Sequence, residues 1–466
     1  MTFENMLTEW LVRQRWFAGK GRDVHDLAVI SDTPIDTPVP AGLRHLIVCV
    51  SHGTTVDSYQ LFLGLRDALP AELEHALIGT YEGNLVYDAL HDSELTGPLL
   101  DAIASEATIG PLRFQRIEGV EIETGVDSGA GGRAGGPGTS IVLTGEQSNT
   151  SLVFGESSIL KVFRRLAPGP NPDLEVSAAL ARLGSPHVAE PLGWIETRLE
   201  GAGTVLAILS RYLRAASDGW SLAAASVRDL YATVLASSGG TDQAGQAGRV
   251  GGDFAPEAER LGVATAQVHA DLAAAFGASE LEPDAIRDMA EQMYRRLDLA
   301  VAAVPELTRY ADMIGTGYKD LAKLTDPIPV QRVHGDYHLS QAMRTQTGWV
   351  VLDFEGEPAS PLAQRRARSS PLRDVAGMLR SFDYAARHQL ITHTDHLRLA
   401  SAASDWVRRN STAFTAGYAA AGGLDPAENA VLLRALSLDK AVYEVMYEAR
   451  HRPSWLPIPL ESLAEF

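Results

Sequence analysis

The sequence of 466 residues is long enough for two or three domains of about 100–200 residues each. With 45% hydrophobic and 21% charged residues, it has the composition of a folded globular protein, which excludes a largely disordered or fibrous chain. Asp and Glu (59) outnumber Lys and Arg (40), and the formal net charge of −19 argues against binding to nucleic acid or an anionic membrane surface.

The single cysteine and the N-terminal segment exclude further classes. Cys49 lies in an apolar run and is interpreted as a small core residue; one cysteine permits neither an intramolecular disulfide nor a four-cysteine zinc site. Residues 1–16 contain acidic side chains and no long apolar segment, unlike a signal peptide. No stretch approaches the ~20 apolar residues that span a bilayer. We expect a cytoplasmic protein that binds no membrane.

Residues 1–90 are predicted to form a small N-terminal domain. Apolar residues at helical spacing predict a helix over Glu4–Gln14. Two strand-like runs, Leu43–Val50 and Ser58–Leu65, follow and are expected to be antiparallel neighbours.

Residues 91–139 are predicted to form an intermediate segment. It is expected to be helical around Pro98–Ala104 and extended around Leu112–Glu123. The glycine-rich stretch Ser128–Gly138 predicts a flexible linker or loop.

Residues 140–212 are predicted to form a small β-rich lobe. Its strands are expected at Ser140–Leu143, Ser151–Phe154, Ile159–Phe163, Val188–Glu196 and Thr204–Leu209, with a helix from Asn171 to Leu183. Lys161 lies within the third of these strands, among apolar residues. A buried amine is unfavourable unless it meets an anion, so Lys161 indicates an anion site. The alternative is a lysine on an edge strand that points outward.

Residues 213–466 are predicted to form a large lobe that is almost wholly helical. The exceptions are a pair of strands around Val330–Val333 and Trp349–Phe354, and a flexible glycine-rich insert at Ser237–Gly252. The chain is therefore expected to be of the α+β class, with a small β-rich lobe and a large helical lobe.

The densest cluster of chemically active residues lies around this strand pair. His334 and Asp336 follow the first strand, Gln341 comes shortly afterwards, and Asp353 ends the second strand. Phosphoryl transfer needs one carboxylate that orients or deprotonates a hydroxyl, and further oxygen ligands that hold magnesium on nucleotide phosphates. An isolated His-x-Asp would favour a turn in which the two side chains bind only backbone groups. The second strand, which is apolar and ends in Asp353, argues for phosphoryl transfer.

These motifs resemble those of the protein-kinase-like superfamily, in its aminoglycoside-phosphotransferase branch, and within that branch the actinobacterial maltokinases. The similar segments span nearly the whole chain: Trp10–Lys20 (WLVRQRWFAGK), Glu146–Leu152 (EQSNTSL), Leu160–Arg165 (LKVFRR), Asp353–Pro358 (DFEGEP), Ser370–Tyr384 (SPLRDVAGMLRSFDY) and His451–Leu460 (HRPSWLPIPL). The resemblance implies a protein-kinase-like two-lobed fold with an N-terminal cap domain, and an enzyme that uses ATP and Mg²⁺.

The resemblance also assigns roles to the motif residues. Asp336 is similar to the catalytic aspartate, and Gln341 and Asp353 resemble the two metal ligands. Lys161 looks like the lysine that holds the α- and β-phosphates. Glu175 resembles its ion-pair partner on the first helix of the small lobe.

Two further segments are expected to contact ATP. The polar turn formed by Gln147, Ser148, Asn149 and Thr150 has no glycines, so hydroxyls, an amide and backbone N–H groups would have to hold the phosphates. Ser-Asn-Thr is also ordinary turn chemistry. The second segment, Ser210, Arg211, Tyr212 and Leu213, lies where the superfamily binds adenine, and it is also a connection from a strand to a helix.

The acceptor site is expected around the catalytic loop and the C-terminal region. The candidates for sugar contact are Asp336, Tyr337, His338, Asp374, Glu444, Tyr447, Glu448, Arg452 and Trp455. Lys440, Glu444 and Glu448 share one face of a predicted helix. Such a stripe forms a solvated face as readily as a binding surface. The aromatic plane of Trp455 and the nearby donors suit a sugar ring.

Departures from the maltokinase pattern are concentrated beside Asp336. Maltokinases have Leu and Gly where this chain has Tyr337 and Ser340, a pattern similar to the actinobacterial glucosamine kinases. A bulkier residue at 337 is expected to shrink the space for a second sugar ring. The predicted activity is therefore phosphorylation of glucosamine to glucosamine 6-phosphate, with maltose to maltose 1-phosphate as the alternative.

Two other classes remain as alternatives. A pseudokinase that binds nucleotide or sugar without chemistry is disfavoured because all five predicted catalytic, metal and phosphate-binding residues are present. A protein kinase is disfavoured because the chain lacks a glycine-rich loop and an Ala-Pro-Glu motif. The expected partners are ATP and a small sugar, and a monomer is favoured.

Overall fold

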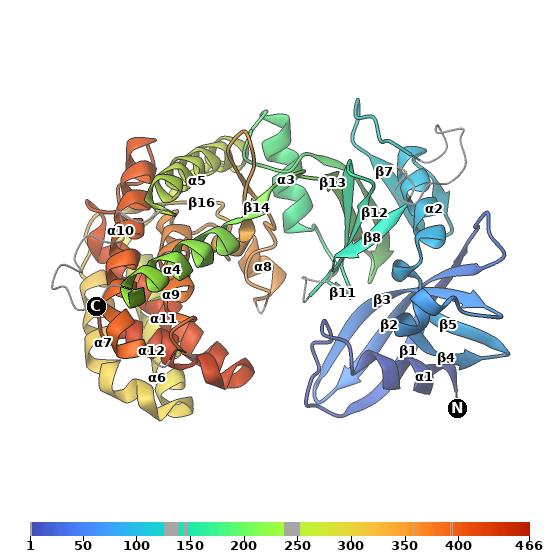
Figure 1. Ribbon diagram of the computed structural model, residues 1–466, viewed down its shortest axis with the longest axis horizontal. Helices are drawn as coiled ribbons and strands as arrows, with labels where there is room; N and C mark the ends of the chain where they lie inside the picture. The colour runs from blue at the N-terminus through green and yellow to red at the C-terminus, as the bar shows by residue number, and fades with distance from the viewer. Residues whose placement is uncertain are drawn as a thin grey trace. The chain divides into compact units, whose positions relative to one another are not determined.

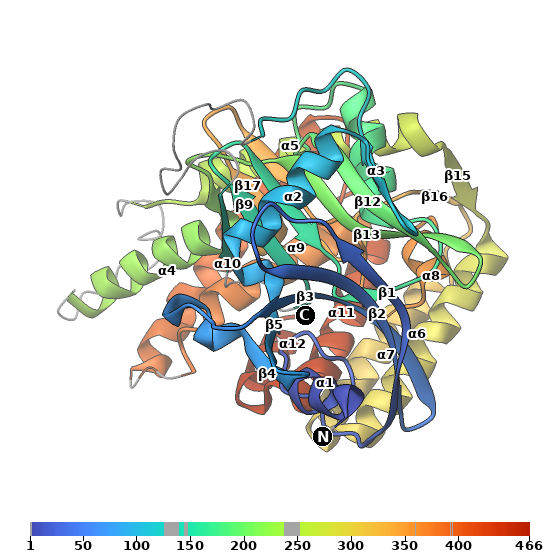
Figure 2. The same cartoon turned by 90° about the vertical axis from the view of Figure 1, so that its right-hand side faces the viewer.

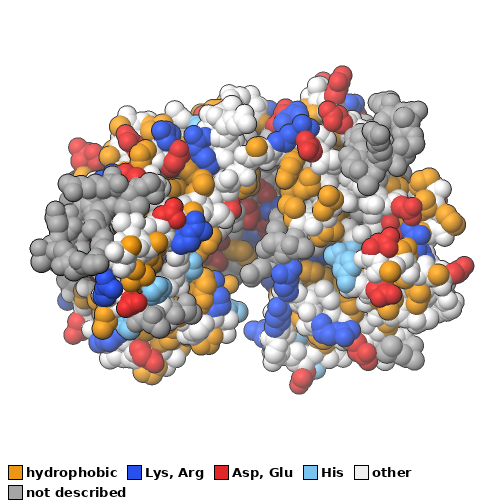
Figure 3. Space-filling model, in the orientation of Figure 1, with side chains coloured by type: hydrophobic (Ala, Val, Ile, Leu, Met, Phe, Trp, Pro, Cys, Tyr) orange, Lys and Arg blue, Asp and Glu red, His pale blue; other side chains and the backbone are white. Residues whose placement is uncertain are grey.

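The computed structural model describes residues 2–124, 139–143, 148–236, 252–358, 360–391, 393 and 395–466. The chain forms two compact units, which are described separately below. Unit 1 comprises Met1–Ala178 and Ala189–Arg214, and unit 2 comprises Ala179–Val188 and Ala215–Phe466. On the visible face of each unit, acidic and basic side chains are interspersed with hydrophobic ones (Figure 3).

Unit 1 is rich in β-structure (Figure 1). Its elements, including the helix α3 that extends into unit 2, are α1 (Phe3–Leu11), β1 (Val24–Ile35), β2 (Gly42–His52), β3 (Thr55–Arg66), η1 (Ala71–Ala76), β4 (Leu77–Tyr81), β5 (Asn84–Asp88), η2 (Ala89–His91), α2 (Ser93–Ala104), β6 (Thr108–Ile109), β7 (Leu112–Arg116), β8 (Ser140–Leu143), β9 (Thr150–Phe154), β10 (Ser158–Val162), β11 (Arg165–Leu166), α3 (Pro172–Arg182), β12 (Pro191–Leu199) and β13 (Ala202–Arg211).

The first sheet of unit 1 has the strand order β1-β2-β3-β5-β4, with β11 added alongside β3. Strands β2 and β3 form the predicted antiparallel pair, and β1 to β3 run side by side (Figure 2). The predicted N-terminal helix is confirmed as α1, which begins where the Thr2 side chain accepts a hydrogen bond from the Asn5 amide at 3.2 Å. Its buried residues Met6, Leu7, Trp10 and Leu11 pack into the same core as the sheet.

The second sheet has the order β6-β7-β12-β13-β10-β9-β8, and the first two strands predicted for the small lobe are its antiparallel pair β8 and β9. Strand β10 is hydrogen-bonded to β13 on one side and to β9 on the other. Lys161 is therefore on an interior strand, so the edge-strand alternative is wrong. The strand predicted over Leu112–Glu123 ends at Arg116.

The two sheets of unit 1 are joined by shared packing and by buried polar contacts. One hydrophobic core contains residues of both, such as Phe62 and Leu160. The buried Gln60 side chain donates to the carbonyl oxygens of Phe163 and Leu206, at 2.7 and 2.6 Å. Buried Arg164 pairs with Asp88 of the first sheet.

Unit 2 is mainly helical, as predicted. Its elements are β14 (Ser217–Asp218), α4 (Gly219–Ala236), α5 (Ala255–Phe276), β15 (Ala278–Leu281), α6 (Pro283–Ala303), η5 (Pro305–Tyr310), α7 (Ala311–Leu321), β16 (Ile328–Gln331), η6 (Leu339–Gln341), β17 (Ala342–Arg344), β18 (Trp349–Val351), α8 (Leu362–Arg365), α9 (Leu372–Arg387), α10 (His396–Ala420), α11 (Ala430–His451), η7 (Pro453–Trp455) and α12 (Pro457–Leu463). Within the described ranges, no helix is both long and apolar enough to cross a membrane.

The strands of unit 2 do not pair as the sequence suggested. Strand β16 pairs with β15, and β18 pairs with β17, so the two predicted strands belong to different sheets. The reason is local: each strand pairs with a short neighbour that carries polar or small residues and has no strand-like pattern of its own. The predicted linker Ser128–Gly138 lies outside the described residues, as does the predicted insert except for Gly252.

Candidate active site

The loop between β16 and η6 is shaped by a buried carboxylate beneath it. Asp374, in the first turn of α9, accepts hydrogen bonds from the backbone amides of His334 at 2.7 Å and Gly335 at 2.9 Å. His269 contacts the same carboxylate at 3.0 Å. Gly335 has a φ of 86°, a left-handed conformation that favours glycine. The His-Gly-Asp sequence thus allows two consecutive amides to point at one side chain.

This placement contradicts the prediction that Asp374 contacts the sugar. The side chain is only 1% exposed, and both carboxylate oxygens are engaged by the loop amides and His269. Burial alone would raise the pKa of Asp374, but the hydrogen bond and charge of His269 hold it below the usual range. Asp374 is therefore an ionised group that fixes the loop from below.

His334 links this loop to the end of β18. One ring nitrogen, Nε2, lies 2.8 Å from the Leu352 carbonyl oxygen and must donate to it, so the other, Nδ1, can accept from the Asp336 amide at 3.4 Å. Leu352, the residue before Asp353, is thereby connected through the His334 ring to the backbone of Asp336. The two carboxylates predicted for catalysis and metal binding are thus on segments that brace one another.

Asp336 is paired with a lysine that lies far away in the sequence. Lys440 Nζ in α11 is 3.2 Å from Asp336 Oδ1. Burial would raise the pKa of Asp336, but the charge of Lys440 and the Lys440 hydrogen bond hold it below the usual carboxyl range. Asp336 is therefore an ionised carboxylate at neutral pH, as a base or an orienting group for a hydroxyl requires.

Tyr337 and His338, the residues after Asp336, have different surroundings. The Tyr337 ring is buried (3% exposed), packs against His334, and its hydroxyl lies 2.9 Å from Thr265 Oγ1 in α5. The prediction that this side chain contacts the sugar and narrows its site is therefore wrong, because it points into the core. Burial and the charge of Lys440 lower the pKa of His338 although Asp336 opposes this, so a neutral imidazole lies near Asp336.

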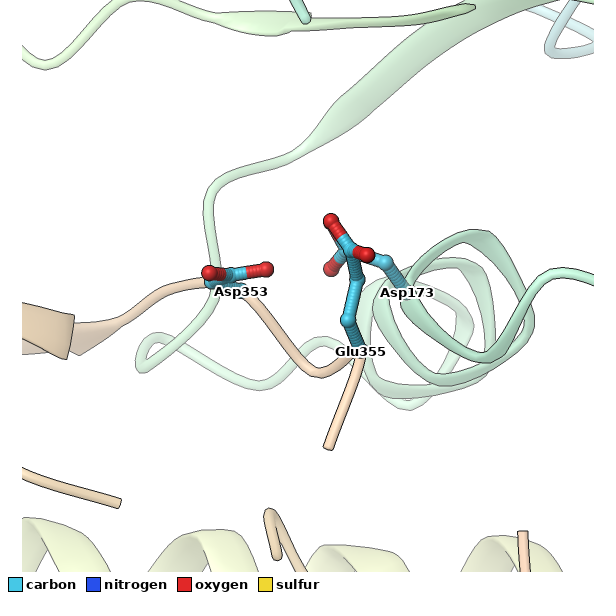
Figure 4. A group of neighbouring side chains, drawn as sticks. All are labelled: Asp173, Asp353 and Glu355. Carbon is cyan, nitrogen blue, oxygen red and sulfur yellow. The ribbon is translucent and has the colours of Figure 1, made fainter. Parts of the chain in front are cut away.

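The predicted metal ligands Gln341 and Asp353 are brought together. Gln341 Nε2 donates to Asp353 Oδ2 at 2.9 Å, so the amide oxygen of Gln341 is the atom that could bind a cation. Asp353 has a φ of 64°, an unusual conformation for a residue with a side chain. Glu355 follows on the same loop (Figure 4). A donor set of carboxylate and amide oxygens fits Mg²⁺.

In unit 1, Lys161 forms an ion pair with the first turn of α3. Its Nζ lies 3.0 Å from Asp173 Oδ2, and Asp173 is at the start of that helix (Figure 4). The family resemblance implies Glu175 of the same turn as the partner of Lys161, and that role stays a prediction. Both acids are near the helix N-terminus, so the sequence alone could not choose between them.

The two segments predicted to bind ATP are partly engaged within unit 1. Thr150 Oγ1 accepts a hydrogen bond from Arg164 Nε at 2.8 Å, whereas Ser148 is exposed and Asn149 half-buried. Gln147 lies outside the described residues. After Ser210, the Arg211 and Tyr212 amides donate to the carbonyls of Glu190 and Ser157, at 2.8 and 2.9 Å. A base would have to contact other backbone groups here, such as those of Leu213.

The predicted acceptor residues of α11 are held by partners on other elements. Arg380 of α9 binds Glu444 at 2.8 Å, and Glu448 accepts from Arg452 at 2.7 Å and from Tyr384 at 3.1 Å. Glu444 and Glu448 are 8% and 1% exposed, so the alternative of a solvated stripe is wrong.

Arg452 also orders the aromatic residues at the end of α11. Its guanidinium carbon lies 4.5 Å from the centre of the Trp455 ring and 5.4 Å from that of Tyr447. These three predicted acceptor residues form one cluster, with an aromatic plane and several donors. The sequence did not assign Asp173, Glu357 or Arg380 to the site. It also gave no indication that Lys440 pairs with Asp336.

The fold is shared with solved structures of known type. The chain is similar to a glucosamine kinase in complex with glucosamine, ADP and inorganic phosphate, with a TM-score of 0.61, 24% identity, and 92% of this chain and 94% of that chain covered. A second glucosamine kinase structure, crystal form B, gives a TM-score of 0.63 at 25% identity, with the same coverage. The fold is the protein-kinase-like two-lobed α+β fold with an N-terminal cap domain.

Sequence comparison identifies the family within this fold. Residues 10–92 match the maltokinase N-terminal cap domain. A glucosamine kinase of Streptacidiphilus jiangxiensis is 33% identical over 69% of this chain and 72% of its own length. One of Mycolicibacterium smegmatis is 30% identical over 68% of this chain and 77% of its own length. The chain belongs to the glucosamine kinase family.

Proposed function

We propose that the protein is an ATP-dependent kinase that transfers the γ-phosphoryl group to glucosamine and forms glucosamine 6-phosphate. The observation that carries this proposal is the loop of Asp336, which presents an ionised carboxylate on a backbone fixed by Asp374, in a chain of the glucosamine kinase family. The 6-hydroxyl of glucosamine is the acceptor that the sequence predicts.

In the proposed reaction, Asp336 accepts the proton of the sugar hydroxyl while the hydroxyl oxygen forms its bond to the γ-phosphorus. The bond between that phosphorus and the bridging oxygen of ADP breaks at the same time, so a carboxylic acid, ADP and the sugar phosphate result. Lys161 would bind the α- and β-phosphates as a cation. Gln341 and Asp353 would hold Mg²⁺, which neutralises phosphate charge when bound.

The sugar contacts are proposed for the cluster at the end of α11. Trp455 offers an apolar plane for the C–H groups of a sugar ring, and Tyr447 and Arg452 offer donors for its hydroxyls. Glu444 and Glu448 remain candidates for the sugar ammonium, although each already neutralises an arginine. Because the Tyr337 side chain is buried, its bulk no longer supports a preference for a monosaccharide. That preference is supported by the similarity to glucosamine kinases.

The test is ADP release, coupled to an optical signal, with glucosamine, maltose, glucose, N-acetylglucosamine and an aminoglycoside as acceptors. We expect glucosamine to have the highest kcat/KM, and phosphorus–carbon couplings in the product to report a 6-phosphate. Efficient turnover of maltose without turnover of glucosamine would show the maltokinase alternative to be right. No acceptor-dependent release with any sugar would support a binding protein.

A further inference from the structure

Lys440 lies between two carboxylates of unit 2 that come from different loops. Its Nζ is 3.2 Å from Asp336 Oδ1 and 3.6 Å from Glu357 Oε2. The other oxygen of Glu357 accepts a hydrogen bond from Tyr443 at 2.6 Å, and Tyr443 lies one turn after Lys440 in α11. The three charged side chains and the tyrosine therefore form a continuous network that ends at Asp336.

The network is sheltered from water, which strengthens its electrostatic effect. The side chains of Lys440, Asp336 and Glu357 are 27%, 21% and 14% exposed. Burial would lower the pKa of Lys440, but Asp336, Glu357 and Glu444 raise it above the usual value, so the amine is charged. Lys440 also lies 4.9 Å from the centre of the Tyr443 ring, a further stabilising contact for a cation.

The contact leaves the two oxygens of Asp336 in different environments. Oδ1 receives the lysine ammonium. In the part of the chain that the structure describes, Oδ2 has no hydrogen-bond partner from the protein. A carboxylate held at one oxygen cannot rotate freely, and the other oxygen is then the one that a hydroxyl can approach.

We propose that Lys440 is a positioning residue for phosphoryl transfer, which fixes the Asp336 carboxylate in one orientation and is itself held by Glu357 and Tyr443. This inference rests on the proposed function, because it takes Asp336 as the group that receives the hydroxyl proton. It gives α11 a part in catalysis, because neither the family motifs nor the residue spacing had assigned a catalytic role to Lys440. A small misplacement of a reacting group costs up to about a hundredfold in rate, so the effect should be measurable.

The test compares four variants in the glucosamine assay with the full chain. Lys440→Met removes the charge and keeps most of the side-chain volume, and Lys440→Arg restores a cation. Tyr443→Phe removes only the hydroxyl that binds Glu357. The matched control is Lys323→Met. Lys323 is exposed, and its ion-pair partner Asp320, at 2.8 Å, is not part of this network.

We expect Lys440→Met to lower kcat about tenfold to a hundredfold while the KM for ATP stays within about twofold. Lys440→Arg should recover part of that loss, and Tyr443→Phe should lower kcat by only about twofold to fivefold. Lys323→Met should match the unmodified protein. Melting temperatures are measured for all variants, because a merely structural role would lower stability without a selective loss of kcat.

A kcat for Lys440→Met within about threefold of the unmodified protein would overturn the inference, as would equal losses for the Met and Arg variants. If Lys440→Met does not fold, Tyr443→Phe and Glu357→Gln decide, and unchanged kcat in both refutes the network. If the unmodified protein rejects glucosamine, the proposed acceptor is wrong, and the variants are compared with the acceptor that does support turnover. If none does, both proposals fail.

Discussion

Among the residues that the structure describes, each unit contains one lysine–aspartate pair that involves a predicted functional residue, and the two pairs are built differently. In unit 1, Lys161 lies on the interior strand β10 and meets Asp173, 12 positions later at the start of α3. In unit 2, Asp336 lies on a loop and meets Lys440, 104 positions later. The first pair joins a strand to the next helix along the chain, so its two residues are close in the sequence. The second pair forms only when distant parts of the helical unit pack together.

A sequence reveals one of these pairs more readily than the other. A lysine among apolar strand residues is conspicuous, because a buried charge demands a partner. A lysine on a helix that also carries Glu444 and Glu448 has the pattern of a surface salt bridge. Only the fold shows that α11 turns this face toward the catalytic loop. If the two pairs also differ in what they do, changes to them should affect different steps of the reaction.

The largest effect is expected at Asp336. Asp336→Asn keeps the shape of the side chain but removes the charge that accepts the hydroxyl proton, so kcat should fall by about 10²–10⁴-fold. Nucleotide affinity, measured by calorimetry, should stay within about twofold. Turnover near that of the unmodified protein would mean that another group is the catalytic carboxylate.

The pair in unit 1 should instead control nucleotide binding. Lys161→Met should weaken ATP binding by roughly tenfold to a hundredfold, because a charge-assisted hydrogen bond to phosphate is worth about 1.5–3 kcal/mol. Asp173→Asn and Glu175→Gln are compared in the same titration. The variant with the larger loss of ATP affinity identifies the acid that positions Lys161. If Lys161→Met lowers only kcat, the two lysine–aspartate pairs do not differ in function.

Asp374 should act on stability and on its pH dependence. Asp374→Asn leaves a loop amide or His269 without a charged acceptor, at a cost of about 1–3 kcal/mol of unfolding free energy. Because the pKa of Asp374 is lower in the folded protein than in an unfolded chain, its contribution is complete above the usual carboxyl pKa of about 4. It is lost as the pH falls through the folded-state pKa.

Denaturant unfolding at several pH values measures this contribution. The stability difference between the unmodified protein and Asp374→Asn should be constant above pH of about 5 and should shrink below pH of about 4. A difference that does not change with pH would mean that the carboxylate is not ionised in the fold. Ser437→Ala, a change of a buried polar residue in α11, is a control that should show no such pH trend.

How far the sequence could predict the molecule depends on the range of the interactions involved. The hairpins β2–β3 and β8–β9, the helix α1 and the placement of Gln341 beside Asp353 follow from local patterns and spacing. The partners of β16 and β18 could not be predicted, since short strands such as β15 carry no apolar alternation. The same holds for Asp374 and Tyr337, because only the packing of α9 and α5 against the loop determines which way each side chain points.

The smallest effect is expected from removal of the Tyr337 hydroxyl, at a position where the structure reverses the interpretation from sequence. The hydroxyl makes one buried hydrogen bond, to Thr265, so Tyr337→Phe should cost about 1 kcal/mol of unfolding free energy. The ring points into the core and not toward a substrate, so the ratio of kcat/KM for glucosamine to that for maltose should stay within about twofold of the unmodified protein. Tyr337→Leu, which introduces the residue found in maltokinases, leaves a partly filled space and should lower stability by more, about 2–4 kcal/mol, again without a gain in maltose turnover. A clear gain in maltose turnover would mean that the residue after Asp336 selects the sugar through the loop backbone that it supports.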